Sequence, residues 1–219
     1  MNQNFDIQTL VSGSSRPYRT VLIFGPPGSG KGTLGKFLSS AGNHFHLSSG
    51  AIFRGIPLES PAGKLFHSYA GKGYLLPDDI TVGIWHHYVE GLIATNRYLP
   101  HQQLLLLDGI PRTTQQALLL EQYIQIMHII VLETACPNGL IKRIKRRALI
   151  ERRLDDLDEG ILKTRMEVYS QNIRPLLEYY SRHPSQVSYF KADARPLEIL
   201  RDVLQKLSDL LSHSEESYI

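Results

Sequence analysis

The sequence has almost no cysteine and no long apolar run. Its one cysteine, Cys136, excludes an intramolecular disulfide and any zinc site built from several thiolates, and we expect it to be a small buried residue. No apolar run approaches the roughly 18 residues that cross a bilayer, and residues 1–18 lack the apolar segment of a secretory signal. We therefore expect a cytoplasmic protein with no membrane partner, in which residues 1–18 form a flexible extension and residues 212–219 a polar tail.

Strong charge of either sign is also missing, because the formal net charge is only +3 over 219 residues. This value does not indicate a wholly basic protein that binds nucleic acid. One basic run, residues 142–153, could form a local nucleic-acid patch, but it lacks interleaved aromatic side chains. The histidines match no spacing that is typical of a metal site. We expect neither a nucleic-acid partner nor a metal bound by histidine.

Apolar runs of strand length recur along the chain. They lie at residues 20–24, 104–107, 128–132 and 187–190, with a weaker run at 45–47. Segments with helical spacing separate these runs. Short buried strands that alternate with helices favour a parallel sheet covered on both faces, so we predict one α/β domain over residues 19–211.

Three helical segments show an apolar stripe, and two other segments break the alternation. The stripes are Ile80, Ile84, Tyr88 and Leu92; Met166, Tyr169, Ile173, Leu176 and Tyr180; and Leu200, Leu204, Leu207 and Leu211. Residues 55–77 are rich in glycine and proline, and residues 142–153 are rich in lysine and arginine. We interpret both as insertions that lie outside the core of the sheet.

The first strand-like run leads into a loop that is poor in side chains, FGPPGSGKGT at residues 24–33. Gly25 to Lys31 follow the pattern G-x-x-x-x-G-K between a strand and a helix, which is the context of a phosphate-binding loop. Glycines let backbone N–H groups reach phosphate oxygens, and the helix N-terminus and the Lys31 ammonium add positive charge. Gly32 departs from the general pattern, which places serine or threonine directly after the lysine.

Other charged side chains suit the same chemistry. Asp108 ends a strand-like run, where its carboxylate is placed to hold Mg²⁺ through water; the alternative is a cap for a helix that begins near Thr113. A guanidinium grips two phosphate oxygens at once, which favours arginines around a transferring phosphoryl group. Spacing alone does not select among the candidates Arg54, Arg112, Arg147, Arg153 and Arg165.

Five segments in a fixed order resemble the nucleoside-monophosphate kinases, and most closely the adenylate kinases with a short lid. They are GPPGSGKGT at 25–33, HLSSGAIFR at 46–54, GYLLPDDIT at 73–81, LLDGIPRTTQQA at 106–117, and RRLDD at 152–156 with KTRMEVYSQNIRPLLEYY at 163–180. The Gly-Lys-Gly-Thr ending of the first segment is typical of this family. The resemblance covers residues 19–210 and implies a three-layer P-loop NTPase fold with a five-stranded parallel sheet, a monophosphate-binding insertion at 48–77 and a short lid at 141–157.

The resemblance also implies an activity, the reversible transfer of the terminal phosphoryl group from MgATP to AMP to give two ADP. ATP would contact Gly25, Pro26, Pro27, Gly28, Ser29, Gly30, Lys31, Gly32, Thr33 and Arg143. AMP would contact Ser49, Gly50, Arg54, Leu75, Gly109, Arg112, Gln116, Arg153 and Arg165. The catalytic cations would be Lys31, Arg112, Arg147, Arg153 and Arg165, with Asp108 serving Mg²⁺ through water. The lid is too short for the zinc cluster of long-lid members, so no zinc is expected, and a monomer is the default.

Gln116 and Ser49 favour AMP as the acceptor. An amide side chain can pair with the N6 amino group and a ring nitrogen of adenine, and Ser49 stands where AMP-specific members usually have threonine. Ala51 replaces a residue that is acidic in most members, and Ile110 replaces the usual phenylalanine of D-G-F-P-R. Two alternatives stay open: a kinase that prefers UMP or CMP, and a non-catalytic regulatory protein that binds ATP and AMP, for which Ala51 is the only hint.

Overall fold

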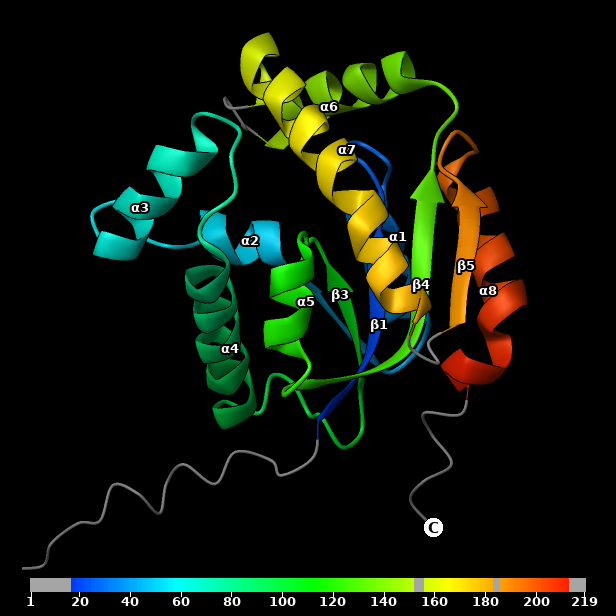
Figure 1. The fold of residues 1–219 in the computed structure, drawn as a ribbon. Helices are drawn as coiled ribbons and strands as arrows, with labels where there is room; N and C mark the ends of the chain where they lie inside the picture. The colour runs from blue at the N-terminus through cyan, green and yellow to red at the C-terminus, as the bar shows by residue number, and fades with distance from the viewer. Residues whose placement is uncertain (1–16, 152–155, 183–185, 213–219) are drawn as a thin grey trace, which may run out of the picture.

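A five-stranded parallel sheet runs through the middle of the molecule (Figure 1). The computed structural model describes residues 17–151, 156–182 and 186–212. The strands are β1 (Tyr18–Phe24), β2 (His44–Ser48), β3 (Leu104–Asp108), β4 (Ile124–Glu133) and β5 (Gln186–Lys191), in the spatial order β2-β3-β1-β4-β5. The predicted sheet is confirmed, including the weak run at 45–47, which becomes β2.

Helices cover both faces of this sheet, which is why its strands are apolar along their length rather than alternating. One face carries α1 (Lys31–Ala41) and α8 (Pro196–Ser212), and the other carries α4 (Asp78–Ala94), α5 (Thr114–Leu120) and α7 (Glu159–Ser181) (Figure 1). Every residue of β3 is buried between these two layers. The three-layer α/β architecture is therefore confirmed.

The remaining helices belong to the two segments predicted as insertions. Helices α2 (Ser49–Arg54) and α3 (Pro61–Ala70) lie beyond the β2 edge of the sheet, and α6 (Pro137–Glu151) lies above its upper end (Figure 1). Among the described residues, no helix is both long and apolar enough to cross a membrane.

The apolar stripe predicted for residues 80–92 is rotated about the helix axis. The buried residues of α4 are Thr81, Val82, Trp85, Val89 and Leu92. Tyr88, which was assigned to the buried face, is 40% exposed. Of the four predicted stripe residues only Leu92 is buried, because Trp85 and Val89, each one position further along the chain, occupy the buried face in place of Ile84 and Tyr88.

The other two stripes are partly correct. In α8, Leu207 and Leu211 are buried, but Ile199 and Val203 take the buried positions predicted for their leucine neighbours. In α7, Leu176 and Tyr180 are buried in the core, whereas Tyr169 and Ile173 line a cavity and are only half-buried.

The described part of the basic run 142–153 lies in α6, which buries Leu140, Ile144 and Ala148 on one side, so its basic side chains share a helix with an apolar stripe. Because these apolar residues are spaced by four, they form one stripe that the surrounding charges obscured. Cys136 is exposed rather than buried, since it lies in the turn that leads into α6.

Candidate functional site

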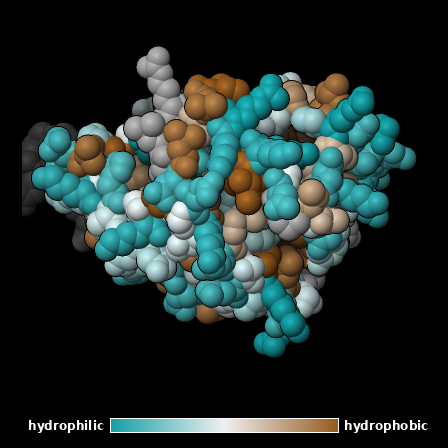
Figure 2. All heavy atoms as spheres, turned by 90° about the horizontal axis from the view of Figure 1, so that it is seen from above, coloured by the Kyte–Doolittle hydropathy of each residue, from teal (hydrophilic) through white to brown (hydrophobic). Residues whose placement is uncertain are grey.

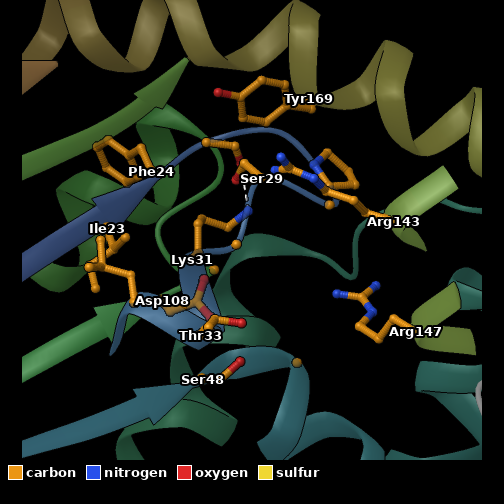
Figure 3. A pocket seen from close by; sticks show the side chains of 18 of the residues that line it. Ile23, Phe24, Ser29, Lys31, Thr33, Ser48, Asp108, Arg143, Arg147 and Tyr169 are labelled. Carbon is orange, nitrogen blue, oxygen red and sulfur yellow. Dashed lines mark hydrogen bonds between the residues drawn. The ribbon is translucent and has the colours of Figure 1, made fainter. Parts of the chain in front are cut away.

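A cavity of about 700 Å³ opens at the carboxyl ends of β1 and β3. Its walls are the loop after β1, the start of α2, the turn after β3, α6, α7 and the loop between β5 and α8 (Figure 3). The neighbouring strands β1 and β3 lead to helices on opposite faces of the sheet, and ligands of open α/β sheets bind at such a point. Figure 2 views the molecule from this end, where hydrophilic side chains cover much of the surface.

The loop between β1 and α1 presents backbone to this cavity. Gly25, Gly28 and Gly30 have φ angles of +153°, +81° and +95°, which side chains disfavour. A Cβ atom on Gly25 would lie 2.9 Å from the carbonyl oxygen of Leu132, and one on Gly28 would lie 2.9 Å from the side chain of Ile144. Backbone conformation therefore favours glycine at all three positions, and close packing also requires it at Gly25 and Gly28. The loop ends at the N-terminus of α1, where helical N–H groups favour anions.

Lys31 is the first residue of α1, and its side chain turns back along the loop (Figure 3). Its ammonium donates hydrogen bonds to the carbonyl oxygens of Gly25, at 2.6 Å, and Pro26, at 3.0 Å. Burial and the nearby positive charges of Arg112, Arg147 and Arg165 lower the pKa of Lys31 to about 8, although Asp108 acts in the opposite direction. The structure thus holds Lys31 in a region of strong positive potential, which an anionic ligand would relieve.

Asp108 is the carboxylate of this region. It ends β3, with Ile23 and Ser48 as its register partners on the two neighbouring strands, and only 6% of its surface is exposed. Burial alone would raise the pKa of Asp108, but the His46 ring, 3.9 Å away, and the Lys31 ammonium lower it overall. The alternative role as a helix cap is wrong, because Thr113 is the N-cap of α5.

The predicted arginines gather around the same space. Arg54, Arg112, Arg143, Arg147 and Arg165 all line the cavity, although they come from α2, the turn after β3, α6 and α7. Arg153 lies outside the described residues. Arg143 also donates to the carbonyl oxygen of Ala192 at 2.6 Å, which ties α6 to the loop after β5.

A buried carboxylate that sequence reasoning did not select holds two of these arginines. Asp156 has no exposed surface, and it accepts a hydrogen bond from Arg147 at 2.6 Å and another from Arg165. Although burial would raise the pKa of Asp156, the two guanidiniums lower it overall. The signal was present in the RRLDD segment, but an aspartate beside arginines is common on protein surfaces and did not stand out.

A smaller pocket adjoins the cavity. Its lining includes every predicted AMP contact in the described part of the chain, namely Ser49, Gly50, Arg54, Leu75, Gly109, Arg112, Gln116 and Arg165. The larger cavity is lined by the predicted ATP contacts except Pro26. Arg54, Arg112 and Arg165 line both, so three guanidiniums stand at the junction of the two spaces.

The polar side chains of the smaller pocket are held by hydrogen bonds. The Ser49 hydroxyl donates to the Gly109 carbonyl oxygen at 2.7 Å, and Arg112 Nε donates to the same oxygen at 2.6 Å. These contacts join the start of α2 to the turn after β3. The departures from the family pattern lie nearby: Ala51 lines the larger cavity, and Ile110 is fully buried in the core.

Some cavity residues carried no functional signal in the sequence. Tyr169 was assigned to an apolar stripe, yet it lines the cavity opposite the glycine loop (Figure 3). Asp193, Ala194 and Arg195 form the wall after β5, in a loop whose composition is unremarkable. Their contribution depends on the chain folding back to the loop after β1, which no local pattern encodes.

A glycine loop that joins a central strand to a helix, opposite a cluster of arginines, defines a P-loop protein that binds nucleotides through their phosphates. Comparison with known families narrows this class. A family model described as adenylate kinase matches residues 23–185. The chain belongs to the adenylate kinase family.

Individual relatives agree with this assignment. An adenylate kinase of Flavobacterium psychrophilum is 32% identical over 199 residues, covering 88% of this chain and 98% of the relative. One from Prochlorococcus marinus is 33% identical over 193 residues, covering 86% and 98%. One from Borrelia turicatae is 33% identical over 193 residues, covering 74% and 87%.

The buried contact of Asp156 with two arginines yields a testable expectation. Asp156→Ala should lower kcat by up to about 100-fold, because Arg147 and Arg165 lose the group that fixes their positions. Steady-state assay of nucleotide phosphoryl transfer measures this effect. Glu159→Ala is the matched control, since it breaks the Lys145–Glu159 ion pair, in which the Glu159 side chain is 81% exposed and little should depend on it. Equal rates for the two variants would contradict the positioning of the arginines by Asp156.

Proposed function

We propose that this protein catalyses reversible transfer of the terminal phosphoryl group from MgATP to AMP, giving two ADP. The observation that carries this proposal is the pair of adjoining pockets with Arg54, Arg112 and Arg165 at their junction. A donor with several phosphates fits the pocket with the glycine loop, and an acceptor with one phosphate fits the smaller pocket. Membership of the adenylate kinase family supports both the donor and the acceptor in this proposal.

The reaction needs no covalent intermediate with the protein. An oxygen of the AMP phosphate attacks the terminal phosphorus of ATP, the bond from that phosphorus to its bridging oxygen breaks, and the electron pair stays on the departing ADP. Lys31 and the loop amides hold the donor phosphates in line with the acceptor, and the arginines offset charge on the transferring group. We assign these roles to Arg112, Arg147 and Arg165, and also to Arg153, which lies outside the described residues.

The donor set fits Mg²⁺ that arrives with ATP. Among the described residues no three histidine, cysteine or acidic side chains converge on one point, so a metal held by protein alone is not built here. Mg²⁺ bound with ATP would instead keep several waters and take its other ligands from phosphate oxygens. We assign the holding of such waters to Asp108, which lines the cavity and whose pKa is lowered, and the ion would neutralise phosphate charge.

The two segments 48–77 and 141–157 would close over AMP and ATP and exclude water from the transfer. Family membership also supports a cytoplasmic monomer as part of this proposal. The regulatory alternative, a protein that binds both nucleotides without catalysis, rests on Ala51 alone. A preference for UMP or CMP is opposed by Gln116, which lines the pocket proposed for the acceptor base.

A panel of nucleoside monophosphates tests activity and base choice together. With MgATP as donor, kcat/KM for AMP should exceed that for UMP, CMP and GMP by roughly 100-fold, because a site built to hydrogen-bond one base rejects bases that leave its polar groups unpaired. A coupled assay of ADP formation measures each rate. Binding of ATP and AMP by calorimetry without ADP formation would instead support the regulatory alternative.

Two variants exclude a contaminating kinase in that panel. Arg112→Ala should lower the AMP rate by orders of magnitude, since it removes a guanidinium shared by both pockets. Arg174→Ala should keep the wild-type rate, because Arg174 pairs with Glu178 on the exposed side of α7. Activity that survives Arg112→Ala would remove this residue from the site.

The pKa of Lys31 predicts a pH dependence. In the free enzyme kcat/KM for MgATP should fall above about pH 8, because the neutral amine no longer attracts phosphate. Lys31→Arg should be slower but level over the same range, since a guanidinium stays charged. A wild-type profile that stays level well above that pH would contradict the role of Lys31.

A further inference from the structure

The amide of Gln116 is held at both ends by the protein. Its side chain lines the smaller pocket, with only 1% of the residue exposed. The amide nitrogen donates to Asp78 Oδ1 at 2.9 Å, and the amide oxygen accepts from the backbone N–H of Arg112 at 2.8 Å. The Thr113 hydroxyl donates to the same Asp78 oxygen at 2.9 Å, which fixes that carboxylate in turn.

These two contacts permit only one orientation of the amide. A carboxylate oxygen can only accept a hydrogen bond, and a backbone N–H can only donate one. Turning the Gln116 amide over would set oxygen against the Asp78 oxygen and NH₂ against the Arg112 N–H. Both hydrogen bonds would be lost in a buried place, where unpaired polar groups cost the most.

The locked amide still has hydrogen-bonding capacity to spare. Its nitrogen carries a second hydrogen, and its oxygen carries a second lone pair. The free edge therefore offers one donor and one acceptor in a fixed order. Adenine complements this order, because its 6-amino group donates and its N1 accepts. Hypoxanthine and guanine carry the reverse order, with an accepting oxygen at position 6 and an N1–H donor.

We propose that Asp78 is a positioning residue for base selection: it locks Gln116 in the orientation that accepts a 6-aminopurine and rejects a 6-oxopurine. The inference rests on the proposed function, which places the acceptor base at Gln116. Asp78 is not among the described residues that line the two pockets, so it acts through Gln116 and not by touching the nucleotide.

The position of Asp78 suits a rigid lock. It is the first residue of α4, which is anchored in the core through the fully buried Trp85 and Val89. Asp78 is therefore held by the core of the domain, although the preceding segment, 48–77, is the one proposed to move on the AMP side.

The test compares AMP with IMP, which replaces the 6-amino group by oxygen and adds a proton at N1. The ratio of kcat/KM for AMP to that for IMP should fall about tenfold in Asp78→Ala, the effect of one hydrogen bond to a charged group. Asp78→Asn should retain most of the wild-type ratio, because its side-chain oxygen can still accept from Gln116. Asp78→Ser provides a second truncation, with the same expected fall, in case the alanine variant does not fold.

Asp79→Ala is the matched control, since it removes the neighbouring exposed acid from the same first turn of α4. Its ratio should equal that of the wild type. A merely structural role of Asp78 would lower both rates equally and leave the ratio unchanged, and that result in a folded truncation would overturn the inference. Failure of the wild type to phosphorylate AMP would instead overturn the proposed function, so the two failures are distinguishable.

Discussion

Holding several cations in one cavity is the constraint on which the rest of this structure depends. Lys31 shares the cavity with arginines from α6, α7 and the turn after β3. Burial and their repulsion lower its pKa to about 8. Two buried carboxylates offset part of this charge, Asp108 beside Lys31 and Asp156 beneath two of the arginines. The positive potential that is left over attracts a polyanion.

The parallel sheet and its helices hold these cations close together although the cations repel one another. The cations come from α1, α2, the turn after β3, α6 and α7, and α6 is anchored by the buried residues Leu140, Ile144 and Ala148. The glycine loop then adds backbone donors without adding bulk, and Ile144 packs where a side chain on Gly28 would otherwise lie. The two pockets would recognise their ligands differently. The larger one would bind phosphates through positive charge and backbone N–H groups, and the smaller one would bind the base through the donor and acceptor of the Gln116 amide.

The sequence allowed much of the fold and part of the site to be predicted. Buried parallel strands are continuous apolar runs, so all five strands were found, and the glycine loop is recognisable because its chemistry is local. Predicting which residues of a helix are buried was less successful. In α4 the buried residues include Val82 and Trp85, which the predicted stripe left out, and in α6 the many charged residues made the apolar stripe difficult to recognise. Asp78 could not be assigned a role, because its partner Gln116 lies 38 residues away and only the packing of α4 beside α5 brings them together. The grouping of the predicted contacts into two adjoining pockets agrees with their proposed roles, which remain predictions.

The most direct test of the central claim is a calorimetric titration with two adenosines joined by a polyphosphate chain. If one cavity holds donor and acceptor side by side around shared arginines, this single ligand should bind once per chain. It should bind far more tightly than ATP or AMP alone, because binding at one end makes binding at the other intramolecular. A linked ligand that binds no more tightly than ATP, or that binds twice per chain, would contradict the account.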